Sequence, residues 1–171
     1  RVRPWSPIYG ARQHPLLGYR MPTSIPTWEH VIEPVSLGWL RDHVIQDSTV
    51  FPAAGYVEMA LAAGMSRHGT DSVAVEGLEI HKHIVIAEND PPRVEFALSG
   101  EDNGFRVSAG AVGDLKPALV AVGRVVPLTG KQSEDAPPLD AIRERLTDHL
   151  AGIEHYRLCA EHGLSYGTAF R

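Results

Sequence analysis

Residues 37–64, LGWLRDHVIQDSTVFPAAGYVEMALAAG, decide the fold of this chain. After Pro52 the stretch consists almost entirely of good helix formers, and proline is favoured at the first position of a helix. We therefore expect a helix that begins at Pro52 and ends near Gly64 or Gly69. This helix is apolar on nearly every side, so it should be surrounded by protein, and its charged residue, Glu58, needs a hydrogen-bond partner.

One histidine in the same stretch is placed to carry chemistry. His43 precedes Pro52 by nine residues in a loop, which brings the imidazole beside the first turn of the helix. Backbone N–H groups in that turn lack partners within the helix and lie at the positive end of its dipole. A thioester carbonyl bound there would be polarised, and the histidine could remove the neighbouring α-proton. The small residues Ala53, Ala54 and Gly55 would let a substrate approach closely, although a lone histidine is more often structural.

Four strand-like stretches follow the helix. They cover residues 73–86, 93–99, 105–112 and 118–126. Side chains in the second and third alternate between apolar and polar, as in half-buried strands. The segment GEDNG at 100–104 is typical of a hairpin turn, and the apolar phase of the first strand changes near Gly77, which indicates a bulge. A buried helix followed by an antiparallel meander predicts an α+β hot-dog fold, in which the sheet wraps around a central helix.

The segment that precedes the histidine completes this unit, which we assign to residues 1–128. Residues 1–27 contain five prolines and are expected to be extended, with little helix. Residues 28–35 are a strand candidate with Val31 and Val35 on one face, and Pro34 within it indicates an edge position or a bend.

The C-terminal part of the chain has a different pattern. Residues 129–138 are polar and rich in proline, as in a linker. Within residues 139–171 apolar residues recur every three or four positions, which predicts one amphipathic helix that ends before Gly163. The apolar stripe consists of Ile142, Leu146, Leu150 and Ile153.

Composition excludes several classes of function. The chain of 171 residues is 43% hydrophobic, enough for one sizeable core, and its net charge of −5 leaves no basic face for nucleic acid. Its single cysteine, Cys159, cannot form an internal disulfide, which favours a reducing compartment. No apolar run is long enough for a signal peptide or a membrane span, so we expect a soluble, cytoplasmic protein without membrane partners. Because the chain begins with Arg1 rather than Met, we expect it to be part of a longer polypeptide.

Several motifs in the sequence occur in the same order in one known family. His43 and Pro52 match the spacing HxxxGxxxxP, and GYVEMA at 55–60 continues it. HPLLG at 14–18 lies upstream, and YGTAF at 166–170 lies downstream. In these motifs, and over nearly its whole length, the chain resembles the dehydratase domains of modular polyketide synthases and animal fatty acid synthases.

The resemblance implies a double hot-dog of which this chain forms the first half. Residues 139–171 would then be a linker helix and the incomplete start of the second half. The resemblance also implies that His43 is the general base that removes the α-proton of a 3-hydroxyacyl thioester. An aspartic acid from the second half would protonate the departing hydroxyl, and neither Asp140 nor Asp148 matches the family motif for that residue.

The same resemblance implies how the substrate is delivered. It would be carried on the phosphopantetheine of acyl carrier protein, so we expect no cofactor and no metal. The expected partners are acyl carrier protein, the neighbouring domains of a multifunctional synthase, and a second copy of the domain in a homodimer.

Six residues besides the histidine are candidate substrate contacts: Asp47, Pro52, Ala54, Gly55, Tyr166 and Gly167. Asp47 stands where the family motif has glycine, and its carboxylate could hold the loop, favour protonation of the histidine, or point to solvent. Thr168 and Arg171 stand where the family motif YGPxFQ has proline and glutamine. These departures leave a second interpretation open, a hot-dog without catalytic activity that serves as a structural or acyl-binding module.

Other polar residues have simpler explanations. His81 and His83 share one face of a strand, but no third metal ligand lies near them in the sequence, so we interpret them as an exposed face. A charged helix face explains three further histidines: His149, His155 and His162. A thioesterase or isomerase on this fold would need a carboxylate on the central helix, where Glu58 is the sole candidate. The resemblance of GYVEMA to the family motif explains this glutamate better, as a structural residue.

Overall fold

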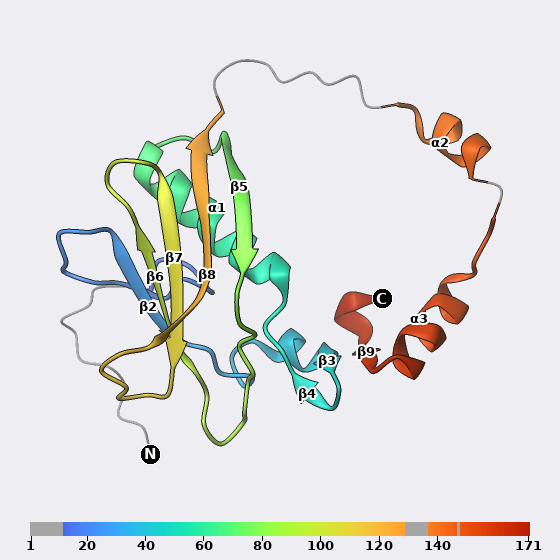
Figure 1. The fold of residues 1–171 in the computed structure, drawn as a ribbon, viewed down its shortest axis with the longest axis horizontal. Coiled ribbons are helices and arrows are strands. Elements are labelled where there is room, and N and C mark those ends of the chain that lie inside the picture. The colour runs from blue at the N-terminus through green and yellow to red at the C-terminus, as the bar shows by residue number, and fades with distance from the viewer. Residues whose placement is uncertain (1–11, 129–136, 147) are drawn as a thin grey trace.

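A six-stranded antiparallel sheet packs against one long helix, α1 (Ala53–His68), in the computed structural model, which describes residues 12–128, 137–146 and 148–171 (Figure 1). The order of strands in the sheet is β1-β2-β6-β7-β8-β5, and every neighbouring pair is antiparallel. The strands are β1 (Tyr19–Arg20), β2 (Thr27–Val31), β5 (Val73–Ile80), β6 (Arg93–Leu98), β7 (Gly104–Gly110) and β8 (Ala118–Pro127). This arrangement confirms the predicted α+β hot-dog fold.

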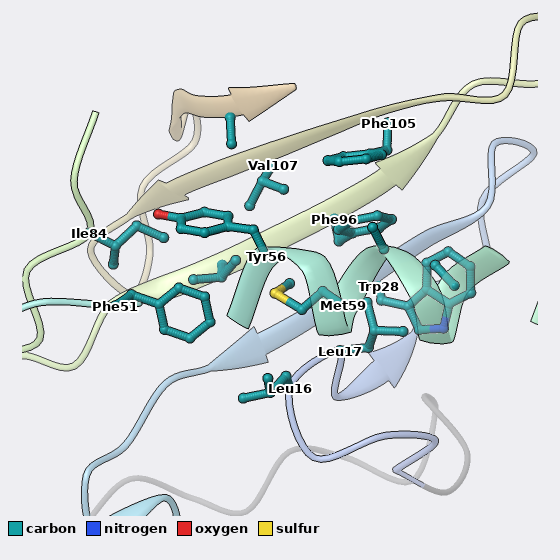
Figure 2. Packing of buried hydrophobic residues seen from close by; sticks show 14 of the residues in the cluster. Leu16, Leu17, Trp28, Phe51, Tyr56, Met59, Ile84, Phe96, Phe105 and Val107 are labelled. Carbon is teal, nitrogen blue, oxygen red and sulfur yellow. The ribbon is translucent and has the colours of Figure 1, made fainter. Parts of the chain in front are cut away.

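The hydrophobic core lies between α1 and one face of the sheet. Tyr56 and Met59 of the helix face Phe96 of β6 and Phe105 and Val107 of β7, and all five side chains are at most 2% exposed (Figure 2). Alternation along β6, where every second residue is buried, places these side chains on one face of the sheet. The apolar pattern that predicted half-buried strands is therefore the pattern that builds the core.

The helix begins one residue later than predicted. Pro52 has extended backbone angles and is the N-cap of α1, and the helix ends at His68, before a left-handed Gly69. The helix is also not surrounded by protein as expected, because Ala54, Glu58 and Met65 on its outer side are exposed. Short side chains such as alanine make this outer side look apolar in the sequence although little area needs to be buried there.

The HPLLG segment covers part of the helix. Leu16 and Leu17 are buried in the same core cluster as Met59, on the side of the helix away from Val107 in Figure 2. The expected partner of Glu58 is His14, whose Nε2 lies 3.2 Å from the carboxylate oxygen Oε1. Two of the motifs that are distant in the sequence are thus in direct contact.

Two details of the meander are confirmed. The register between β5 and β8 shifts between Glu76 and Glu79, which is the predicted bulge. Residues 100–104 form the hairpin turn between β6 and β7, where the Asp102 carboxylate accepts a hydrogen bond from the Gly104 amide.

Two predicted strands are too long. The stretch 73–86 leaves the sheet after Ile80, and its last part instead pairs with the segment before α1, through a bridge between Val50 and Val85. The stretch 28–35 stops at Val31, so Val35 does not share a face with it and is 85% exposed. Pro34 therefore follows a strand that lies inside the sheet, between β1 and β6.

The prediction of a single helix after the linker is wrong. Most of the linker, residues 129–136, lies outside the described residues, and two separate helices follow it, α2 (Leu139–Arg145) and α3 (Gly152–Glu161). Neither helix has a buried residue, and the stripe residues Leu146, Leu150 and Ile153 are more than half exposed. A helix gains most of its stability from tertiary packing of its apolar side, and this stripe stays largely exposed. Helix α3 instead contacts residues 164–166 with another side, where Tyr156 packs against Tyr166.

The remaining strands form a second, three-stranded antiparallel sheet. Its order is β4 (Ser48–Thr49), β3 (His43–Ile45) and β9 (Leu164–Tyr166). Short 3₁₀ helices flank it: η2 (Gly38–Asp42) precedes β3, and η3 (Thr168–Phe170) follows β9. Among the helices of the described residues, none is long and apolar enough to cross a membrane.

Candidate active site

The histidine is held at the start of a tight hairpin. β3 and β4 are joined by two residues, Gln46 and Asp47, with φ values of 46° and 63°. Two consecutive residues with positive φ form the turn that best matches the twist of a two-residue hairpin. Glycine adopts such angles without strain, which explains why the family motif has glycine at the position of Asp47.

The Asp47 side chain lies at the exposed tip of this hairpin. Of the roles considered for its carboxylate, the structure supports the solvent-facing one, because Asp47 makes no hydrogen bond or ion pair with the residues described. A contact between Asp47 and a substrate remains a prediction. Aspartate is among the residues that tolerate a left-handed backbone, so the hairpin survives the replacement of glycine.

The imidazole of His43 is oriented by the chain just ahead of α1. Its Nδ1 lies 2.8 Å from the carbonyl oxygen of Val50, and the Val50 amide donates to the carbonyl oxygen of His43 at 3.1 Å. A carbonyl oxygen can only accept, so Nδ1 must carry the proton and donate it. The lone pair of a neutral His43 is therefore on Nε2. Val50 comes three residues before the first residue of α1, and the bond ties the imidazole to that end of the helix.

Two aromatic rings lie against the imidazole. Tyr166 stands directly opposite His43 in the pairing of β3 with β9, with ring centroids 5.6 Å apart. Phe170 of η3 is closer, at 5.1 Å. The Tyr156 hydroxyl of α3 donates to the carbonyl oxygen of Phe170 at 3.1 Å. The YGTAF motif and the histidine motif, far apart in the sequence, thus form one site.

Gly167 is explained by a residue that the sequence did not reveal, Asp42. The Gly167 amide donates to the Asp42 carbonyl oxygen at 2.8 Å, and a Cβ at position 167 would lie 2.3 Å from the Asp42 Cγ. The Asp42 carboxylate also accepts a hydrogen bond from the amide of Ala169 at 2.8 Å. No local pattern identifies this role, since the two partners are 127 positions apart.

The candidate substrate contacts at the start of α1 differ in their exposure to solvent. Pro52 is buried as the N-cap, and Ala54 is exposed in the first turn. Gly55 is buried, and a Cβ there would lie 2.5 Å from the ring of Phe51, so the missing side chain makes room for this core residue. The sequence attributed that space to a substrate, and the structure shows it filled by the chain itself. Substrate contacts of the backbone at these positions stay predictions.

The two histidines considered as metal ligands form no hydrogen bond or ring contact with the site residues described. His81 and His83 are exposed beyond the end of β5. No group of three histidine, cysteine, aspartate or glutamate side chains that could hold a metal ion is found in residues 12–128, 137–146 and 148–171.

Comparison with known proteins identifies the family. Residues 14–110 match the family described as polyketide synthase dehydratase domain. The chain belongs to this family. The match covers the HPLLG segment, the histidine hairpin, α1 and the sheet through β7. It confirms the resemblance that the motifs had indicated.

Relatives of this polyketide synthase dehydratase domain are large synthases. A highly reducing polyketide synthase from Pyrenophora dematioidea is 38% identical over 92% of this chain, which spans 7% of that protein. A hybrid PKS-NRPS synthetase from Aspergillus niger is 35% identical over 94% of the chain, which spans 5% of it.

Solved structures agree with this assignment. The dehydratase domain from the CurF module of curacin polyketide synthase matches with a TM-score of 0.81 at 25% identity, covering 92% of this chain and 59% of that structure. The dehydratase domain from the terminal module of the rifamycin polyketide synthase matches with a TM-score of 0.76 at 25% identity, covering 95% of this chain and 59% of that structure. The chain thus spans less than two thirds of each solved domain.

Proposed function

We propose that this domain eliminates water from a 3-hydroxyacyl thioester to give the 2-enoyl thioester, with His43 as the general base. The observation that carries the proposal is the hydrogen bond from Nδ1 of His43 to the carbonyl oxygen of Val50. This bond leaves Nε2 as the nitrogen that can accept a proton, and it holds the ring in one orientation.

The proposed reaction moves two protons. Nε2 of His43 takes the α-proton, the electron pair of that C–H bond forms the new double bond, and the bond between C3 and the hydroxyl oxygen breaks. The hydroxyl leaves as water with a proton from an aspartic acid, which we expect from a second hot-dog half. The amides in the first turn of α1 would polarise the thioester carbonyl and so make the α-proton more acidic.

The proposed substrate is an acyl chain attached to the phosphopantetheine of acyl carrier protein. Support comes from the relatives, which are multidomain polyketide synthases of which this chain spans only a few per cent. In such a synthase the domain would act on the product of the neighbouring domains, as a homodimer in the cytoplasm, and would need neither metal nor cofactor of its own.

The test uses a polypeptide that contains this chain together with a complete second half. A 3-hydroxybutyryl thioester of acyl carrier protein is incubated with it, and mass spectrometry follows the loss of water. We expect turnover that His43→Ala abolishes and that His81→Ala, at an exposed histidine outside the site, leaves unchanged. Turnover by the His43→Ala protein at the unaltered rate would discard the assignment of the base.

The second candidate function is a hot-dog that binds acyl chains or supports the synthase without catalysis. This alternative was suggested by Asp47, an aspartate at the family's glycine position. The Asp47 side chain lies exposed at a hairpin tip. The same assay separates the two functions, because a folded wild-type protein that binds the thioester without forming the enoyl product would favour the non-catalytic module.

A further inference from the structure

The residue before the histidine has a role of its own. We propose that Asp42 is a positioning residue, which holds residues 166–170 against His43 so that two aromatic rings confine the imidazole. This inference rests on the proposed function of His43 as base, and it concerns how that base is kept in place.

Asp42 binds the YGTAF motif at three successive residues. Its carbonyl oxygen accepts from the Gly167 amide at 2.8 Å, and its carboxylate oxygen Oδ2 accepts from the Ala169 amide at 2.8 Å and from the Thr168 hydroxyl at 3.2 Å. The carboxylate thereby satisfies an amide in the first turn of η3, which has no partner within so short a helix. One side chain and its own carbonyl therefore fasten the whole segment.

The packing at Gly167 shows how closely the two segments approach. A Cβ at this position would lie 2.3 Å from both Cγ and Oδ1 of Asp42, a distance at which atoms overlap. The tight contact leaves the Asp42 side chain little freedom to move without the motif. Residues on both sides of Gly167, Tyr166 and Phe170, then carry the rings that lie 5.6 Å and 5.1 Å from the imidazole.

Asp42 is linked to the proposed base through the peptide bond between them. Asp42 and His43 are consecutive, so a bond made by Asp42 fixes the motif relative to the backbone that carries the imidazole. His43 in turn is anchored to Val50. Without the Asp42 carboxylate, β9 would still pair with β3 and the Gly167 amide would keep its backbone bond. The turn that carries Phe170 would lose the bonds at Thr168 and Ala169 that fasten it beside the histidine hairpin. A shift of about 1 Å in a reacting group can cost a hundredfold in rate.

Thr168 supplies an additional observation specific to this chain. It occupies the first position of η3, where the family motif has proline, a residue that is favoured at the start of a helix because its φ is fixed. Threonine lacks this restriction, but its hydroxyl bonds to Asp42, which a proline could not do. We infer that this bond replaces the ring of proline in holding the turn.

The experiment measures kcat and KM of Asp42→Ala, Asp42→Asn, Thr168→Val and Thr168→Pro in the polypeptide with a complete second half. We expect Asp42→Ala to lower kcat at least tenfold while KM changes less than about threefold, because the base is misplaced but the acyl chain still binds. Asp42→Asn keeps an oxygen acceptor for the Ala169 amide and should recover most of kcat. Thr168→Pro, which restores the family residue, should retain kcat within about twofold.

Thr168→Val removes one hydrogen bond with little change in shape and should lower kcat only a few-fold. In the Asp42→Ala background it should have no further effect, because its partner is already gone. Should Asp42→Ala fail to fold, the few-fold loss of kcat in Thr168→Val carries the test by itself, and an unchanged kcat in that variant would overturn the positioning role. Asp148→Ala, at an exposed carboxylate between α2 and α3, is the matched control and should leave both constants unchanged.

A second measurement keeps this inference separate from the proposed function. In the 171-residue chain itself, nuclear Overhauser contacts between the rings of His43 and Phe170 should be present and should weaken in Asp42→Ala. If the wild type shows these contacts but no turnover, the proposed function fails and the positioning role is judged by the contacts alone. Contacts and kcat that are both unchanged in a folded Asp42→Ala protein would overturn the positioning role.

Discussion

Nδ1 of His43 and the carbonyl oxygen of Val50 are joined by a hydrogen bond of 2.8 Å, which decides the ring nitrogen that carries the proton. We predict that neutral His43 is protonated on Nδ1 alone. Long-range ¹H–¹⁵N correlation spectra distinguish the two ring nitrogens, and Nε2 should show the shift of an unprotonated nitrogen above the titration range of the ring. His81, which is exposed, serves as the comparison and should show both tautomers. A neutral His43 with its proton on Nε2 would contradict the proposed orientation.

The hairpin turn before α1 can be tested by restoring the family residue. Asp47 has a φ of 63°, which costs a residue with a Cβ about 1 kcal/mol more than it costs glycine. Asp47→Gly should therefore raise the free energy of unfolding by about 0.5–1 kcal/mol, measured by urea denaturation, without reducing turnover. Asp47→Ala is the control and should be less stable than the wild type, since alanine tolerates this φ less well than aspartate. A large loss of turnover in Asp47→Gly would show that the carboxylate takes part in the reaction.

A buried histidine in β2 makes stability depend on pH. Burial, with the positive charges of Arg12 and His14, lowers the pKa of His30 from 6.5 to about 4. Between these values the unfolded chain binds a proton at His30 that the folded chain does not, so lowering the pH favours unfolding. The stability involved, about 3 kcal/mol, is fully present above pH 6.5 and is lost as the pH falls toward 4.

The measurement for His30 is the free energy of unfolding at several pH values in this window. His30→Gln cannot titrate, so its curve should be flatter than that of the wild type, while the other histidines contribute equally to both. Two curves with the same slope would show that His30 does not control this part of the pH dependence.

The contact between helix and sheet can be tested at one glycine. A Cβ at Gly64 of α1 would lie 2.3 Å from Cγ2 of Val125 in β8. Alanine favours a helix over glycine by about 1 kcal/mol, but forcing a methyl group into a packed core costs about 1–3 kcal/mol. We predict that Gly64→Ala lowers the free energy of unfolding and that Val125→Ala makes room for it.

The double variant Gly64→Ala with Val125→Ala should therefore lose less free energy of unfolding than the sum of the losses in the two single variants. Gly152→Ala is the control, because no atom lies within 4 Å of a Cβ at that position. Thermal unfolding of the single, double and control variants measures these changes. If the losses of stability from the two substitutions simply add, the helix shifts to accommodate the methyl group.

Local sequence patterns predicted the elements that depend on interactions between residues close in the sequence. Helix α1 and the hairpin at 100–104 are examples, since helix formers, capping geometry and turn residues act over a few positions. The same reasoning was wrong for the helix after the linker, because its apolar stripe has no partner among the described residues and breaks at 146–151. It also overextended the strand at 73–86, whose last residues pair with the chain before α1.

The candidate site divides in the same way. His43 was proposed as the base because the motif HxxxGxxxxP resembles that of the family, and this motif is a local property of the sequence. Phe170 lay within a motif that the sequence did show, but its contact with the imidazole was not predicted. Asp42 was missed altogether, because its partners are reached only through the pairing of β3 with β9.

The sequence by itself determined the family and the hot-dog meander around a helix, and it pointed to His43 as the proposed base, because these depend on residue types at short spacings. Only the tertiary structure decided which nitrogen of His43 is free, which rings lie beside it, and why Gly167 has no side chain. Those properties depend on backbone carbonyls and on pairs such as Asp42 and Ala169, 127 positions apart, whose approach is set by the packing of the whole chain.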